Sequence, residues 1–161
     1  MAIDMREFWR SNHYSHPPIT DDMIATAELQ LGVRLPAEFL ELLEIQNGGY
    51  TKGFAFPMSQ PTSWAEDHIP LSHLAGIITD PKHKTAQNVL QTEYMTKEWG
   101  LPPKQVLLSG SGHFWITLDD RNGVVPSVAW IDVDCEEDIQ VAPTFAAFLA
   151  GLVPDSNYDG E

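Results

Sequence analysis

Apolar residues in the first third of the chain recur at the three- and four-residue spacing of helices. Ile24, Ala27 and Leu31 follow Thr20, which suits a helix N-cap, and Gly32 ends the run. A second run begins after Pro36, where a missing N–H costs little. The pattern therefore predicts two consecutive helices, and the second has a wide buried stripe formed by Phe39, Leu40, Leu42, Leu43 and Ile45.

The second half of the chain shows the alternation of β-strands. Four segments, separated by turns rich in Gly, Asn or acidic residues, favour strands: residues 105–110, 113–119, 127–133 and 138–142. Short connections between such segments favour antiparallel pairing, with one packed face and one partly exposed face. Trp115 and Trp130 would then lie on neighbouring strands. Residues 53–57 predict a further strand, and residues 69–78 a strand or turn.

The remaining segments complete an α+β pattern. We expect an N-terminal extension over residues 1–18 with a short helix from Asp4, a helix before Gly100, and a closing helix whose apolar stripe is Phe145, Phe148, Leu149 and Leu152. Residues 79–91 carry no clear pattern, and we expect residues 154–161 to be a frayed tail. Because helices precede a run of strands, the order favours α+β over repeated βαβ units. We predict a single domain over residues 1–161, with a mostly antiparallel mixed sheet and helices packed beside it.

Size and composition are typical of an intracellular protein. A chain of 161 residues can bury enough apolar surface to fold as one domain without disulfides. Cys135 is the single cysteine, so no internal disulfide can form, which favours a reducing compartment. The charged N-terminal segment lacks the apolar stretch of a signal peptide, and no apolar run reaches the roughly 18 residues of a membrane span. We therefore expect a cytoplasmic location and no membrane partner.

The net charge of −14 is concentrated near the C-terminal end. Residues 105–161 contain ten acidic residues and one basic residue. Such a field repels phosphate backbones, which argues against direct nucleic-acid binding, and steers association toward basic partners. A solvated acidic face that serves only solubility is the alternative interpretation.

Two glycine-rich segments resemble phosphate-binding loops at first sight. Residues 47–49, Asn-Gly-Gly, follow a helix rather than a strand and lack the Walker spacing, so we interpret Gly48 as the left-handed residue that ends the helix. Residues 109–113, Ser-Gly-Ser-Gly-His, fall between two predicted strands. A hairpin turn explains them better than a ligand loop.

No residue pattern predicts catalysis, a cofactor or a metal. The six histidines lack zinc-site spacing, and we interpret His13 and His16 as a surface pair. The acidic segment 132–138 lacks the glycine and glutamate of a calcium loop. Neither Cys135 nor Ser111 carries a nucleophile signature. The weakest alternative is a small metal-dependent hydrolase, which would require His113 and Asp119 to converge in one pocket.

An ordered set of blocks resembles the SUKH superfamily, which includes fungal cell-wall-assembly regulators and bacterial immunity proteins. The blocks run from about Ile19 to Val153, and they are Leu35-Pro36, Asn47-Gly48-Gly49, Trp99-Gly100-Leu101-Pro102, Gly112 before Trp115, Asp119 with Arg121, Pro126 with Val128, and Ala142 with Phe145 and Phe148. The resemblance implies an α+β domain that binds proteins and has no enzymatic activity. In the bacterial branch the usual partner is a toxin, often a nuclease.

The resemblance supplies no invariant site, so we choose the expected partner-binding surface from charge and aromatic residues. We expect an acidic sheet edge with exposed aromatic residues to bind a basic toxin domain, and its residues are Asp132, Asp134, Glu136, Glu137, Asp138, Trp130 and Trp115. The alternative function is a regulatory scaffold that resembles the fungal members and recognises signalling proteins.

Overall fold

Helices and strands both contribute to the fold, which confirms the α+β class. The computed structural model describes residues 4–10, 12, 14–83, 85, 87–123 and 125–158. Its α-helices are α1 (Asp21–Leu31), α2 (Ala37–Ile45), α3 (Thr92–Trp99) and α4 (Phe145–Gly151). Its strands are β1 (Gly49–Pro57), β2 (His68–Leu74), β3 (Gln105–Ser111), β4 (Phe114–Asp119), β5 (Ser127–Asp132), β6 (Glu137–Ala142) and β7 (Val153–Pro154). Short 3-10 helices span Met5–Glu7, Val89–Gln91 and Asp155–Tyr158.

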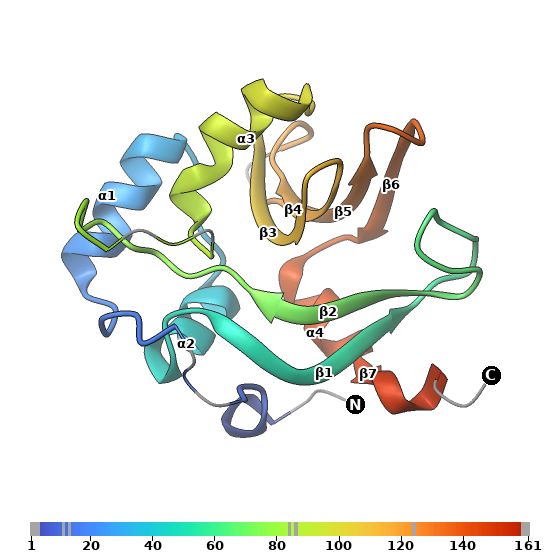
Figure 1. Ribbon diagram of the computed structural model, residues 1–161, viewed down its shortest axis with the longest axis horizontal. Helices are drawn as coiled ribbons and strands as arrows, with labels where there is room; N and C mark the ends of the chain where they lie inside the picture. Colours follow the sequence, from blue (N-terminus) through green and yellow to red (C-terminus); the bar gives the residue numbers. More distant parts are fainter. Residues whose placement is uncertain are drawn as a thin grey trace.

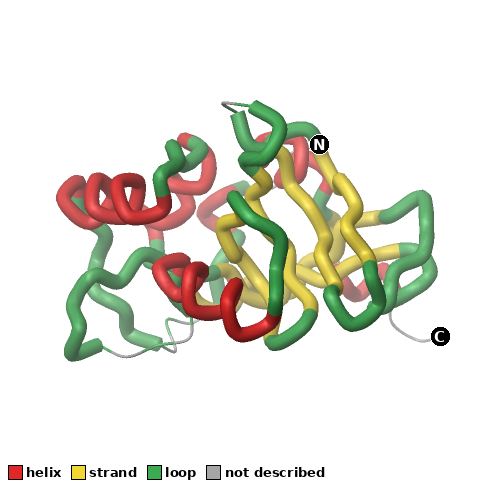
Figure 2. The backbone as a smooth tube through the Cα atoms, turned by 90° about the horizontal axis from the view of Figure 1, so that it is seen from above, coloured by secondary structure: helices red, strands yellow, loops and turns green. Residues whose placement is uncertain are grey.

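The strands form two antiparallel sheets rather than one mixed sheet. One sheet has the order β2-β1-β7 and the other the order β3-β4-β5-β6. The sheets meet where the Ala75 N–H donates to the Leu108 carbonyl over 2.8 Å. Figure 1 shows β2 passing below β3 at this junction. Seen from above, most helical segments lie to one side of the strands (Figure 2).

Local signals set most helix ends where the sequence predicts them. The Thr20 hydroxyl accepts a hydrogen bond from the Met23 N–H at the start of α1, and Thr144 does the same for Ala147 at the start of α4. Gly32 and Gly100 adopt the left-handed conformation at the C-terminal ends of α1 and α3. The predicted stripe of α2 is wrong at one position, because Ile45 is 50% exposed.

The four-stranded sheet is covered on both faces over β3, β4 and β5, whereas Asp138 and Gln140 of β6 are exposed. The inner face packs into the main core through alternating residues such as Ile116, Leu118 and Trp130. On the outer face a second cluster is formed by Leu101, Leu107, Trp115, Ala129 and Ile131, and Met95 of α3 packs against it. The expectation of a partly exposed face is therefore wrong around Trp115, because α3 and the segment after it fold over that face.

The Asn-Gly-Gly segment packs against the chain at Gly76 and Ile77 and does not cap a helix. Helix α2 already ends at Ile45, and Gln46 is extended, so the prediction that Gly48 ends the helix is wrong. The buried Asn47 side chain instead bonds both backbone polar groups of Ile77 and the Pro17 carbonyl. A Cβ at Gly48, where φ is +84°, would lie 2.5 Å from the backbone nitrogen of Gly76. The two chain segments can approach this closely only because both positions are glycine.

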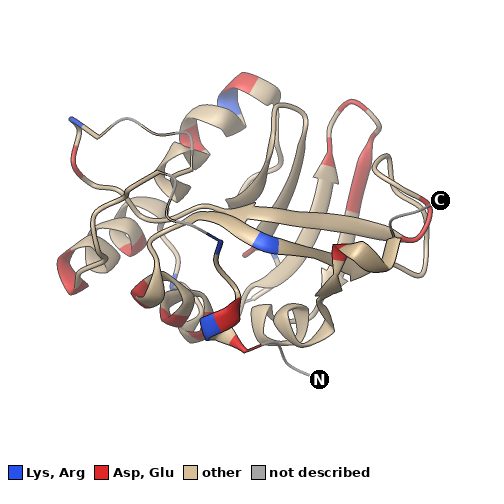
Figure 3. Ribbon diagram, turned by 60° about the horizontal axis from the view of Figure 1, so that its bottom comes forward, with Lys and Arg blue, Asp and Glu red and all other residues tan. Residues whose placement is uncertain are grey.

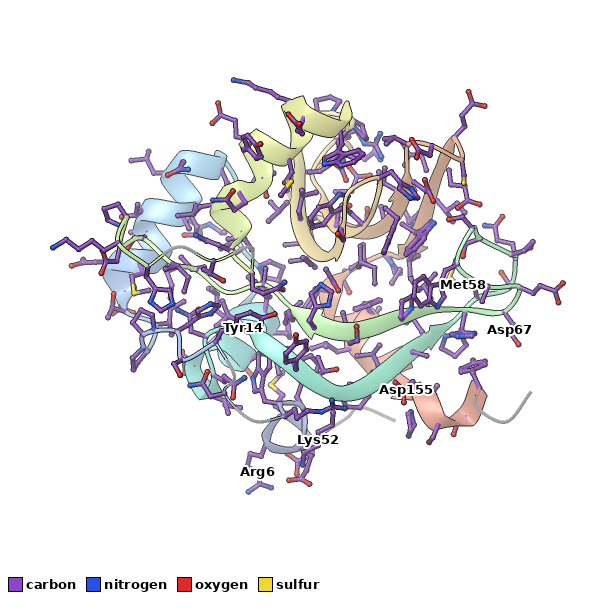
Figure 4. All side chains as sticks on the ribbon, viewed as in Figure 1. Arg6, Tyr14, Lys52, Met58, Asp67 and Asp155 are labelled. Carbon is purple, nitrogen blue, oxygen red and sulfur yellow. The ribbon has the colours of Figure 1, made fainter. Side chains whose placement is uncertain are left out.

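The N-terminal segment is part of the core. Phe8 is fully buried, and the Trp9 indole donates to the Leu42 carbonyl. The Lys52 N–H donates to the Phe8 carbonyl, and the Arg10 N–H donates to Tyr50, so this segment adds to the edge of β1 (Figure 4). The predicted short helix near Asp4 is confirmed as the 3-10 turn Met5–Glu7 with Asp4 as its N-cap.

Two expectations about flexible or exposed ends are wrong. His16 is buried, with its Nδ1 2.7 Å from the Asn47 carbonyl oxygen and its Nε2 3.0 Å from the Thr85 hydroxyl, so it is no surface residue; His13 lies outside the described residues. The expected frayed tail is ordered through Tyr158, because β7 pairs with β1 and the Tyr158 ring stacks on His68 at 3.9 Å. Residues 159–161 lie outside the described part of the chain.

Candidate partner-binding surface

The turn between β5 and β6 is built around one buried carboxylate. Asp132, only 1% exposed, accepts hydrogen bonds from the backbone N–H groups of Asp134 and Cys135 at 3.0 and 3.2 Å. Its Oδ1 also lies 2.7 Å from His113 Nδ1. An aspartate that bonds the backbone two and three residues ahead favours a tight turn. Burial opposes the charge on Asp132, but the hydrogen bonds from Ser63, His113 and Cys135 outweigh it and lower the pKa of the carboxyl group.

The loop between β1 and β2, residues 58–67, docks on this turn. The Ser63 hydroxyl donates to Asp132 Oδ2 over 2.5 Å, and the Ser63 N–H donates to Glu137 Oε1 over 2.9 Å. At the base of the loop the Met58 N–H donates to the Asp67 carbonyl, and Figure 4 labels both residues there. Two segments that are about seventy residues apart in sequence are thus fixed side by side.

Docking of the loop assembles an acidic ridge, which we define as Trp64, Glu66, Asp67, Asp134 and Glu136. The four acidic residues are exposed, and Trp64 is 49% exposed. Figure 3 shows acidic residues and no basic residue on the β5–β6 turn and the neighbouring loop. Among these acids the structure gives close ion-pair contacts only to Asp67, 2.8 Å from His68, and to Asp134, 3.9 Å from His113.

Several residues nominated from the sequence have structural roles instead. Trp130 and Trp115 are 1% and 7% exposed, so the expectation that they are exposed aromatics is wrong. Asp132 is buried within the turn, and Glu137 accepts from both Ser63 and the Trp130 indole. Of the seven nominated residues, only Asp134 and Glu136 therefore belong to the ridge.

Asp138 belongs to a separate ion-pair network. Arg121 donates both to Asp138, at 2.8 Å from two nitrogens, and to Asp119, at 2.9 Å. Burial opposes the charge on Asp119, but hydrogen bonds from Arg121 and Gln105 outweigh it and lower its pKa. The hydrogen bond to Asp138 is the largest cause of a raised pKa of Arg121, and the hydrogen bond to Asp119 is the second. The charge of Asp138 is thus offset within the chain and offers less to a partner.

The arrangement around His113 differs from a catalytic triad. The Ser63 hydroxyl donates to the carboxylate of Asp132 and not to the imidazole, so His113 is not placed to take its proton. His113 and Asp119, which a hydrolase would need together, bond to different partners. In the described residues no three His, Cys, Asp or Glu side chains gather as metal ligands.

Sequence reasoning missed three residues of the ridge. Trp64, Glu66 and Asp67 lie in a polar loop rich in Pro and Ser, and nothing in the sequence links this loop to the acidic segment 132–138. The available signal is local: a tryptophan and two acids follow each other within a polar loop, where an apolar ring has no core to enter. Its proximity to the β5–β6 turn could not be read from spacing.

A comparison with protein-family models identifies the chain. Residues 18–151 match the SMI1 / KNR4 family (SUKH-1). The chain belongs to this family. The expected SUKH resemblance is thereby confirmed, and the acidic ridge lies on a SUKH fold. No curated protein matches the chain. None of the described helices combines the length and apolar character that a membrane crossing requires.

Proposed function

We propose that this SUKH protein is a non-enzymatic, cytoplasmic immunity protein that binds and neutralises a basic toxin domain through the acidic ridge. One observation carries the proposal: four exposed carboxylates and a half-exposed tryptophan lie on a loop and a turn that hydrogen bonds from Ser63 hold together. Carboxylates select and steer a basic surface, while the indole supplies the apolar contact that charges alone do not provide.

A nuclease toxin suits this surface on chemical grounds. Such an enzyme must present lysines and arginines to the phosphate backbone, and the ridge can occupy the same groups. A standard complex buries roughly 1,600 Å² in total, so the ridge would be only part of the contact area. Its exposed charges mainly raise the association rate, whereas the apolar contact of Trp64 would slow dissociation.

The proposal predicts that a toxin domain is encoded beside this gene, and the test measures binding to that domain. The double variant Asp134→Lys/Glu136→Lys should reduce the association rate about tenfold or more at low salt and weaken its salt dependence. The matched control is Glu41→Lys/Glu44→Lys, which makes the same charge change on exposed positions of α2. Surface plasmon resonance at several salt concentrations gives both rates.

The outcomes separate the surface from the function. Equal rates for the two double variants would place the contact elsewhere on the protein. Failure of the unaltered protein to bind and inhibit the toxin would remove the immunity role. Binding to a signalling protein instead would favour the scaffold function of the fungal type.

A further inference from the structure

A groove opens next to the acidic ridge, between the edge strands of the two sheets. Strands β2 and β3 are held together by the Ala75–Leu108 hydrogen bond and by the Gly110 N–H, which donates to His73 Nε2 over 3.2 Å. His73 also lines a cavity of about 200 Å³. Its walls include Trp64, Pro70, Ser72, His73, Ser111 and Phe114.

One wall of the groove is aromatic. The ring centroids of Trp64 and Phe114 are 5.9 Å apart, and those of Phe114 and Trp130 are 5.8 Å apart. Trp64 is half exposed, so its ring is open to a ligand, whereas Trp130 lies at the buried end. Aromatic faces carry partial negative charge and attract cations.

The carboxylate of Glu137 contacts the buried end of this wall. Glu137 accepts hydrogen bonds from the Trp130 indole and from the backbone of Ser63, the residue before Trp64. No lysine or arginine lines the groove within the described part of the chain. Burial lowers the pKa of His73, so this histidine adds no positive charge near neutral pH. The field in the groove therefore favours a cation over an anion.

We propose that the groove binds an arginine side chain of the basic protein partner. The alkyl stem would lie against Pro70 and Phe114, and the planar guanidinium would stack on Trp64. The exposed hydroxyl groups of Ser72 and Ser111 can accept its N–H donors. The inference rests on the proposed function, because it adds to the acidic ridge a pocket for one anchoring side chain.

The groove can be tested without the partner. The probe is Nα-acetyl-argininamide, titrated into the ¹⁵N-labelled protein and followed by NMR, with Nα-acetyl-leucinamide as the apolar control. Saturable shifts of the Trp64 indole N–H and of the Gly110 and Ser111 amides are expected for the arginine derivative alone. Equal shifts with the leucine derivative, or no saturable shifts with either, would overturn the proposal.

Variants make the test specific. Trp64→Ala should abolish the saturable shifts at Gly110 and Ser111 and weaken binding of the toxin domain about tenfold or more, as expected for a hot-spot residue. Tyr94→Ala is the control, because Tyr94 is an exposed aromatic residue on α3. If Asp134→Lys/Glu136→Lys loses toxin binding and Trp64→Ala keeps it, the proposed function is retained and the groove is rejected. A groove that binds arginine in a protein that binds no toxin would reject the proposed function alone.

Discussion

Single buried polar side chains fix the irregular parts of this molecule. Asn47 is 3% exposed and uses both ends of its amide to hold the backbone of Ile77. The Nδ1 atom of His16 lies within hydrogen-bond distance of the backbone carbonyl of Asn47. Because an unpaired buried polar group costs free energy, such side chains specify one arrangement of the loops they join.

The contact between Gly48 and Gly76 gives a stability prediction. Gly48→Val should lower the free energy of unfolding by about 3 kcal/mol or more, because φ is +84° there and any Cβ meets the Gly76 backbone. Gly123→Ala is the control, since nothing lies within 4 Å of a Cβ at that position. Urea denaturation measures both. Similar stability of the two variants would contradict the assigned packing.

Asp120 gives a prediction on pH dependence. Its Oδ2 is buried and has no hydrogen-bond partner among the described residues. Burial, followed by the charge of Asp119, raises its pKa from 3.8 to about 6. The folded state therefore binds this proton more tightly than the unfolded state, so stability decreases as pH rises from about 4 through 6.

Replacing this carboxyl group should reverse that loss. Asp120→Asn should raise the melting temperature at pH 7.5 by about 1–3 °C, a small value because Asp120 is partly exposed and solvent screens its charge. Near pH 4 the difference between the variant and the parent should largely disappear. Calorimetry at the two pH values measures it, and a pH-independent difference would show that the ionisation of Asp120 is not its cause.

At the scale of elements, the β1–β2 loop and the β5–β6 hairpin behave as one unit. Neither element carries the acidic ridge alone, because Trp64 and two acids come from the loop and the other two acids from the turn. Ser63, Asp132 and Glu137 join the two elements. The ridge therefore depends on hydrogen bonds made by residues that a partner need not touch.

Asp132 is the central residue of this unit. Asp132→Ala should lower the free energy of unfolding by roughly 2–4 kcal/mol, because Ser63, His113 and the turn N–H groups lose their acceptor. It should also increase hydrogen exchange in residues 58–67. Asp132→Asn removes the charge of the side chain but keeps its shape, so it tests the contribution of the charge. The pKa of Asp132 is lowered, so the stability from its charge is present above about pH 4 and disappears as the pH falls further.

At the scale of the whole molecule, the core extends beyond the segment that defines the family. The family match begins at residue 18, but Phe8 is fully buried and its ring stacks on Phe54 at 5.4 Å. The C-terminal end returns to the same sheet, where Val153 pairs with Ala55. Both ends of the described chain thus cover β1.

This packing predicts that the N-terminal segment is required for stability. Phe8→Ala should lower the free energy of unfolding by about 3–5 kcal/mol, as expected for a large ring removed from a core. Leu29→Ala, at a position 86% exposed, should change it little. Chemical denaturation checks both values, and a small effect of Phe8→Ala would mean that the segment only lies on the surface.

Regular elements were predictable, and the sites that join them were not. Thr20, Gly32, Gly100 and Thr144 act on their own neighbours in sequence, so their effects can be read locally. The two sheets meet through the hydrogen bond between Ala75 and Leu108, a contact between distant segments that no local pattern encodes. Trp115 occupies a position that the alternation of β4 assigns to the outer face. It is buried because α3, which is not part of the sheet, packs over that face.

The sequence by itself determined the α+β class, the order of most elements, the acidic charge and, through its ordered blocks, the SUKH resemblance. These follow from periodicity, capping and composition, which act over a few residues or over the chain as a whole. The tertiary structure alone decided which acidic and aromatic residues face solvent. Trp115 and Trp130 are buried in the two apolar clusters, and Asp132 is buried in its own turn. Long-range hydrogen bonds from Ser63 dock the loop that carries Trp64, Glu66 and Asp67 on the turn that carries Asp134 and Glu136.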